Sequence, residues 1–270
     1  MNTAFMPCED ITSPEQVYQL TTYLSNGFLY MAMTDYPYNS SFLEPMPAFP
    51  VNVSCQAFAD YDPDTSSKAD IWGMLKSASD VYFNSSAQIT CSNINDTDAT
   101  GNLDGAGWNI LACNQLAMPT SMGKDSMFLP EPFNYTAYTA FCQEKYGLTP
   151  NYDWALDNFG GYDYVTDFKS YSNIIFSNGD LDPWKAGGVT SWVNINLPQY
   201  VIKNAAHHLD MRLPVDEDKG TDVEWVREQE SILIGKWVEA YQGPVVMDMK
   251  CAKEITQFES EPQVDLQFLQ

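Results

Sequence analysis

Two short apolar runs in the last third of the chain constrain its fold more than any other feature. Residues 173–176 are followed by Ser-Asn-Gly-Asp, and residues 199–203 lead into a loop that carries both histidines of the chain. Short apolar runs bounded by turn residues are typical of buried parallel strands. Pro183 can open a helical crossover between them, because proline is favoured at the first position of a helix. The order predicts the α/β class, with polar loops at the carboxyl ends of two neighbouring strands.

Upstream of about residue 165 the pattern is helical. Ser13 and Gln16 predict a capping box for a helix over residues 14–34, with Pro14 at its first position. Further helices are predicted at about residues 69–82, 108–116, 135–146 and 222–241. The expected organisation is a helical domain over 1–165, an α/β segment over 166–243 and a tail over 244–270.

Asp182 and His207 are the candidate catalytic residues, one in each strand-end loop. An imidazole that takes the proton of a nucleophile needs a carboxylate to fix its tautomer and to stabilise its charged form. Asp followed by His is the order of the last two triad members in α/β-hydrolases. On spacing alone, a turn with solvated acids is the competing interpretation of Asp182, and an ordinary loop is that of His207 and His208.

The motifs around these residues resemble the lysosomal prolylcarboxypeptidase and dipeptidyl peptidase II family of serine exopeptidases. NIIFSNGDLDPW and AAHHLDMR carry the resemblance, together with MAMTDYPY, PMPAFPVNVSC, WNILACNQLAMP and KDSMF in the family's order. The similar region covers about residues 25–242. The resemblance implies the C-terminal part of an α/β-hydrolase fold, preceded by a mostly helical, substrate-binding cap domain that is incomplete at its N-terminus.

The resemblance also implies roles for individual residues. Asp182 would be the triad acid and His207 the general base, whereas Asp180 lies where the family varies and is assigned to the turn. Trp184 and Met118 match apolar positions near the family's proline pocket. For Met118 the alternative is plain core filling, which is common for methionine.

Two disulfides, Cys55–Cys91 and Cys113–Cys142, are implied by the resemblance. Cys8 then lacks a counterpart, because Ser121 stands where the family would have one, and Cys251 lies beyond the similar region. The six cysteines include no close C-x-x-C pair, so no zinc site is expected. No cofactor is expected for this chain.

Five N-x-S/T sequons indicate a glycosylated protein that passes through the secretory pathway. Their asparagines are Asn39, Asn52, Asn84, Asn95 and Asn134. The net charge of −23 argues against nucleic acid and anionic membranes as partners, because both would repel the chain. No run of eighteen apolar residues occurs, so no membrane span is expected.

The family's nucleophile is missing from the sequence. G-x-S-x-G, the signature of the serine elbow, occurs nowhere in the 270 residues. The serine and a signal peptide are expected upstream of Met1, since MNTAFMPCED has no basic or apolar leader pattern. The chain alone is therefore expected to be inactive, to expose apolar surface, and to form a homodimer or associate with a missing N-terminal half.

The leading hypothesis is a lysosomal or secreted serine exopeptidase that cleaves peptides next to a proline near one terminus, through an acyl-enzyme. The alternative is a non-catalytic secreted glycoprotein derived from the same family and used for binding. An esterase on the same fold is a third hypothesis. Carboxypeptidase and dipeptidyl-peptidase action both remain open at this point.

Overall fold

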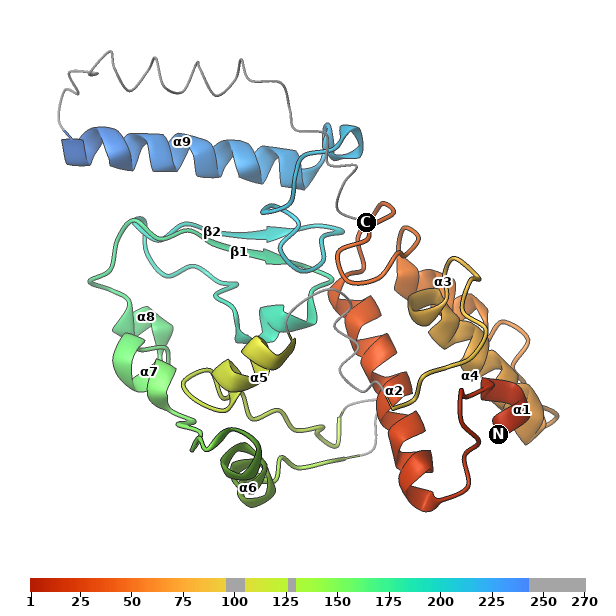
Figure 1. The fold of residues 1–270 in the computed structure, drawn as a ribbon. Helices are drawn as coiled ribbons and strands as arrows, with labels where there is room; N and C mark the ends of the chain where they lie inside the picture. The colour runs from red at the N-terminus through yellow and green to blue at the C-terminus, as the bar shows by residue number, and fades with distance from the viewer. Residues whose placement is uncertain (96–104, 126–129, 243–270) are drawn as a thin grey trace, which may run out of the picture. The chain divides into compact units, whose positions relative to one another are not determined.

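The computed structural model describes residues 1–95, 105–125 and 130–242 (Figure 1). The chain divides into two compact units, Met1–Val226 and Arg227–Gln270. Of the second unit, residues 227–242 are described, and they continue the last helix. The domain boundary predicted at residue 165 lies inside the first unit and stays a prediction.

The helices of the described residues account for most of the regular structure. They are α1 (Asn2–Phe5), α2 (Pro14–Met33), α3 (Pro50–Gln56), α4 (Lys68–Phe83), α5 (Gly105–Ala112), α6 (Tyr135–Tyr146), α7 (Trp154–Phe159), α8 (Tyr164–Asp167) and α9 (Asp222–Gln242). The predicted helices α2, α4, α6 and α9 are confirmed to within a residue at each end. The helix predicted over 108–116 is shifted, because α5 starts at Gly105 and ends at Ala112.

Local capping explains where the long helices begin. The Ser13 hydroxyl accepts a hydrogen bond from the Gln16 amide at 3.3 Å, and Gln16 Oε1 accepts one from the Ser13 amide at 3.1 Å. This capping box satisfies two of the free N–H groups at the start of α2. Ser67 and Asp70 form the same motif at the start of α4.

The core of the helical region packs α1, α2, α3 and α4 together. Met31 and Tyr82 are almost fully buried in this core, and burial of a large apolar side chain contributes about 1.5–3 kcal/mol. Gly27 of α2 lies against the ring of Phe83, and a Cβ atom there would come within 2.5 Å of it. The small residue therefore allows α2 and α4 to approach closely.

The sheet of the described residues has two parallel strands, β1 (Phe176–Gly179) and β2 (Gln199–Ile202). They run side by side in the same direction in Figure 1. β2 confirms the second predicted strand, whereas β1 starts at the last residue of the predicted run 173–176. Pairing starts at Phe176 opposite Gln199, next to Pro198, whose carbonyl accepts from the Phe176 amide. Proline has no N–H to extend the ladder towards Ile174 and Ile175.

The disulfides are Cys8–Cys91 and Cys113–Cys142. The second was predicted, but the predicted Cys55–Cys91 pair is wrong, and Cys8 does have a partner. Backbone hydrogen bonds that link residues 6–8 to Ser92 hold Cys8 beside Cys91. Cys55 lies in α3 as an exposed free thiol. Cys251 lies outside the described residues.

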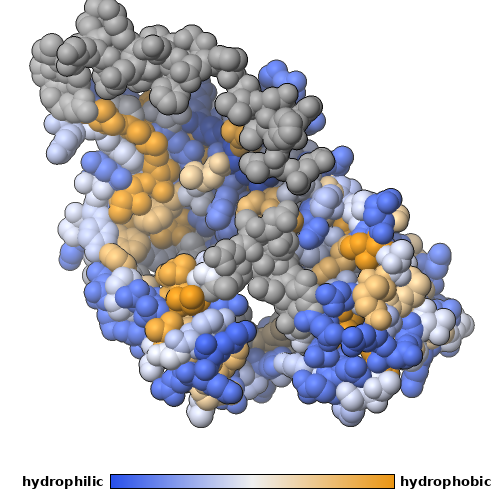
Figure 2. Space-filling view, in the orientation of Figure 1, coloured by the Kyte–Doolittle hydropathy of each residue, from blue (hydrophilic) through white to orange (hydrophobic). Residues whose placement is uncertain are grey.

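The surface carries apolar patches among hydrophilic residues, as Figure 2 shows for one face. Exposed apolar side chains include Ile110 and Leu111 of α5, Ile174 before β1 and Val201 on β2. No helix in the described ranges has the length and hydropathy needed to cross a membrane.

Candidate active site

Asp182 and His207, 25 residues apart in sequence, lie in hydrogen-bonding contact: His207 Nδ1 is 2.8 Å from Asp182 Oδ2. The two loops meet because β1 and β2 are parallel neighbours, so their carboxyl ends share one edge of the sheet. Asp182 is only 6% exposed, and the side chain of His207 is 19% exposed. A proton on Nδ1 that is donated to the carboxylate leaves Nε2 with a lone pair, which is the arrangement of a general base.

The carboxylate of Asp182 is fixed through both of its oxygens. Oδ2 faces His207, while Oδ1 accepts a hydrogen bond from the Trp184 amide at 2.9 Å. Asp182 is thereby the N-cap of the short 3-10 helix η1 (Pro183–Gly187), with proline at its first position. The Asp-Pro-Trp sequence therefore folds locally into a cap that orients the acid toward the histidine.

His207 is held from the other side by the helical region. Its amide donates to the Met33 carbonyl at 3.0 Å. Its carbonyl accepts a hydrogen bond from the Tyr36 hydroxyl at 2.6 Å. Tyr36 is 1% exposed, and burial raises the pKa of its phenol, so the hydroxyl remains a donor. Both backbone groups of the candidate base are thus anchored to residues at or just after the end of α2.

The end of β1 and the turn that follows it, which starts at Asp180, fix the histidine loop further. Asp180 Oδ1 accepts from the Ala205 amide at 3.3 Å, and the Leu181 amide donates to the Ala205 carbonyl at 2.9 Å. A Cβ atom on Gly179 would lie 2.2 Å from the same carbonyl oxygen. Asp180 is therefore part of a turn, as predicted, and that turn positions the loop that carries His207.

Trp184 lies between the catalytic pair and α5. Its ring centroid is 6.2 Å from that of His207 and 6.4 Å from that of Trp108, and its indole N–H donates to the Met33 sulfur at 3.2 Å. Trp108 belongs to the WNILACNQLAMP motif, yet sequence reasoning did not single it out. Met118 lies exposed on the segment after α5, and its place in a proline pocket stays a prediction.

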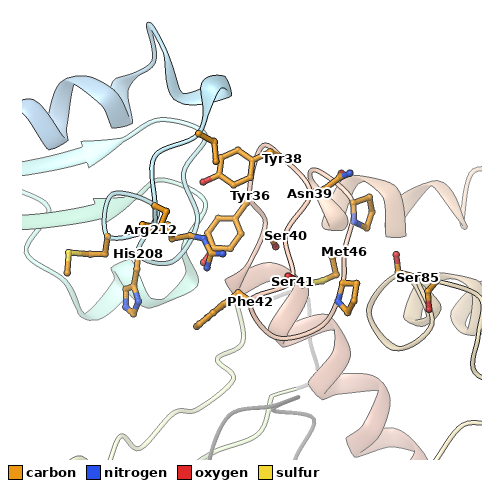
Figure 3. A pocket seen from close by; sticks show the side chains of 16 residues that line it. Tyr36, Tyr38, Asn39, Ser40, Ser41, Phe42, Met46, Ser85, His208 and Arg212 are labelled. Carbon is orange, nitrogen blue, oxygen red and sulfur yellow. The ribbon is translucent and has the colours of Figure 1, made fainter. Parts of the chain in front are cut away.

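His208, the second histidine, lines a groove of about 870 Å³ next to the catalytic pair. Figure 3 shows His208 and Arg212 on one side of the groove and Met46 and Ser85 on the other. The guanidinium of Arg212 lies over the rings of Tyr36 and Phe42 at 4.7 and 5.1 Å. The lining contains no Asp or Glu, although the whole chain is strongly acidic.

The rings of His207 and His208 lie in contact, with centroids 3.4 Å apart. His208 adopts the left-handed backbone region, with φ of 56°, which is uncommon for a residue with a side chain. Burial, and the neighbouring His207, lower the pKa of His208. The neutral form of His208 is therefore favoured beside His207, the candidate base.

The Asp182–His207 pair has the geometry expected of two of the three members of a catalytic triad. In the described part of the chain no serine hydroxyl is hydrogen-bonded to His207, and no cluster of three His, Cys, Asp or Glu side chains could hold a metal ion. An acid–imidazole pair with Nε2 available can accept a proton from a hydroxyl and return it to a leaving group.

Comparison with known proteins identifies relatives of this arrangement. A family model described as serine carboxypeptidase S28 matches residues 1–229. The chain is 41% identical over 214 residues to the lysosomal Pro-X carboxypeptidase of Bos taurus, which covers 78% of this chain and 41% of the bovine protein. Identity to the Homo sapiens protein of the same name is 37% over 206 residues, or 76% of this chain and 40% of the human one.

A more distant relative is the prolyl carboxy peptidase like protein 5 of Caenorhabditis elegans. It is 30% identical over 243 residues, covering 86% of this chain and 47% of the nematode protein. The resemblance inferred from the motifs is thereby confirmed. The chain spans about two fifths of the length of the two mammalian relatives.

Proposed function

Because the chain belongs to the serine carboxypeptidase S28 family, we propose that it supplies the acid and the base of a serine exopeptidase that cleaves next to proline. The observation that carries this proposal is the 2.8 Å contact between His207 Nδ1 and the buried Asp182 carboxylate. The helical region would act as the cap over this site, and the sheet would be the C-terminal part of an α/β-hydrolase fold.

The proposed reaction is acyl transfer to a serine. His207 Nε2 takes the proton of the serine hydroxyl, and the serine oxygen attacks the substrate carbonyl. His207 then gives that proton to the leaving amine, and water hydrolyses the acyl-enzyme by the same route in reverse. The Asp182 carboxylate would orient the imidazole and stabilise the imidazolium. The serine would come from a segment with G-x-S-x-G, which these 270 residues do not contain.

The proposed substrates are peptides with a proline near the C-terminus. The relatives' names, Pro-X carboxypeptidase, favour removal of a residue that follows proline. Trp184 presents an exposed indole ring beside His207, and Trp108 presents one beside Trp184; a proline ring packs well on a flat apolar wall. Met118 is the third candidate for this pocket.

The proposed location is the lysosome or the outside of the cell. Two disulfides among the described residues fit an oxidising route, and the mammalian relatives are named lysosomal. The sequon asparagines would then be accessible to glycosylation during secretion. A homodimer, or pairing with an N-terminal half, is the proposed assembly. The absence of G-x-S-x-G from these 270 residues favours the non-catalytic alternative, but the family and the named relatives do not support it.

The test is hydrolysis of a Pro-X peptide by protein that also contains the segment with the serine elbow. Asp182→Asn should lower kcat by about 10³- to 10⁴-fold, because the imidazole loses its orienting carboxylate. Asp216→Asn is the matched control, since Asp216 is an exposed acid paired only with Lys219 in the described structure. Equal activity of Asp182→Asn and the wild type, or a preference for simple esters over Pro-X peptides, would refute the proposal.

A further inference from the structure

The start of α6 combines a sequon with a cluster of aromatic rings. Asn134-Tyr135-Thr136 reads N-x-T, and Asn134 and Thr136 are both exposed. The Tyr135 ring is 52% exposed and lies 4.8 Å from the Tyr152 ring and 5.0 Å from the Phe133 ring, measured between centroids. Tyr138 continues the cluster, 5.3 Å from Phe133. The proposed catalytic residues play no part in this surface.

The side chain of Asn134 is oriented for modification without loss of its structural role. It is the N-cap of α6, and its Oδ1 accepts a hydrogen bond from the Ala137 amide at 3.0 Å. In the described structure its Nδ2 forms no hydrogen bond. Asn84 differs, because its Nδ2 donates to the Ile89 carbonyl while its Oδ1 accepts from the Ile89 amide. A group attached to Nδ2 of Asn134 leaves the helix cap intact.

We propose that Asn134 carries an N-linked glycan whose first N-acetylglucosamine packs on the Tyr135 ring. Transfer from a lipid-pyrophosphate oligosaccharide breaks the C1–O bond of the sugar, and the pyrophosphate leaves with the electron pair. Nδ2 forms the new bond to C1 and loses one proton, so the amide keeps one N–H and its carbonyl oxygen. The reaction therefore requires no group of this protein other than the sequon.

The aromatic cluster accounts for where the first sugar goes. One face of a pyranose ring presents C–H groups, and these are attracted to the electron-rich face of an aromatic ring. The covalent link to Asn134 holds the sugar beside Tyr135 at high effective concentration, so even a weak contact is populated. The glycan thereby shields the exposed Tyr135 ring at the start of α6 and stabilises the first helical turn. The inference rests on the proposed secretory route but not on peptidase activity.

The test uses the chain secreted from cultured eukaryotic cells, in four forms. Thr136→Ala removes the sequon but keeps Asn134 and all the rings, while Tyr135→Ala keeps the sequon and removes the exposed ring. The double variant completes a cycle in which glycan and ring are removed separately and together. Glycopeptide mass spectrometry measures occupancy at each sequon, and hydrogen–deuterium exchange measures opening of the first turn of α6.

The expected result is occupancy of Asn134 in the wild type and in Tyr135→Ala. With the Tyr135 ring present, the glycan should slow amide exchange in the first turn of α6 by about 2- to 10-fold, as for other ring contacts. In the pair that lacks this ring, the glycan should have no such effect. An equal effect in both pairs, or an empty Asn134 while Asn39 is occupied, overturns the proposal. No occupied sequon at all overturns the secretory route with it.

Discussion

Replacing Tyr36 with phenylalanine removes one hydroxyl from the support of the candidate base. That hydroxyl donates to the His207 carbonyl at 2.6 Å from a side chain that is 1% exposed. Phenylalanine fills the same volume and keeps a ring beneath the Arg212 guanidinium, so the change removes the bond to the His207 carbonyl together with the electrostatic contact of the hydroxyl with Arg212. The carbonyl that loses its donor is left unsatisfied, which costs about 1–3 kcal/mol of folding free energy.

The catalytic effect of Tyr36→Phe should exceed its effect on substrate binding. The His207 amide remains bonded to the Met33 carbonyl, so the loop keeps one anchor and the imidazole shifts rather than detaches. A misplacement of about 1 Å in a catalytic group can cost up to about 100-fold in rate. We expect kcat on a Pro-X peptide to fall about 10- to 100-fold with KM nearly unchanged, in protein that contains the serine elbow.

The assay pairs steady-state kinetics with urea unfolding, and Tyr18→Phe is the control. Tyr18 is an exposed tyrosine on α2, so loss of its hydroxyl should change neither quantity. A Tyr36→Phe protein within about 0.5 kcal/mol of the wild type in stability, with unchanged kcat, would refute a positioning role for this hydroxyl. A rise in KM alone would place Tyr36 in substrate binding instead.

Three further predictions concern the turn, the disulfide and the second histidine. Gly179→Ala should destabilise the protein by about 1–3 kcal/mol in urea unfolding, because its Cβ would clash with the Ala205 carbonyl; Gly73→Ala, which meets nothing within 4 Å in α4, should be neutral or stabilising. Cys8→Ser should lower the free energy of unfolding by about 2–4 kcal/mol in the same assay, whereas Cys55→Ser should not change it measurably. A loss of stability in Cys55→Ser but not in Cys8→Ser would instead support the Cys55–Cys91 disulfide. The lowered pKa of His208 means that the unfolded chain binds the proton more readily. Its contribution to stability should therefore decline as pH falls from about 6.5, and His208→Gln should flatten this decline in melting curves measured from pH 7 to pH 5.

Much of the fold follows from local sequence. Ser13 and Gln16 place the start of α2, and Gly147 ends α6 in the left-handed conformation that glycine adopts readily. The short helices α3, α7 and α8 were not predicted, because helices of four to seven residues give too few turns for an apolar period to appear. Of the three, α3 packs against α2 and α4, and packing of this kind stabilises a helix too short to form by itself.

The candidate pair Asp182 and His207 was predicted from local motifs, but the residues that hold His207 in place were not. Asp182 and His207 each follow a recognisable strand, so parallel pairing alone is enough to bring them together. The Tyr36 hydroxyl and the His207 carbonyl are 171 residues apart, and no local pattern encodes a contact of that range. The Cys8–Cys91 disulfide was not predicted either, because its cysteines are 83 residues apart in sequence. Six cysteines permit many pairings, and no local pattern selects among them.

The helical region and the sheet are coupled at the histidine rather than merely adjacent in sequence. The side chain of His207 is oriented by Asp182, which follows β1. Its backbone is held by Met33 and Tyr36, at or just after the end of α2. A change in where α2 ends should therefore move His207 relative to Asp182, even though no residue of α2 belongs to the proposed acid–base pair. Peptides that cover only the α/β segment should lose the 2.8 Å contact between His207 and Asp182. The reason is that the two hydrogen bonds that fix the backbone of His207 come from Met33 and Tyr36, which lie outside that segment.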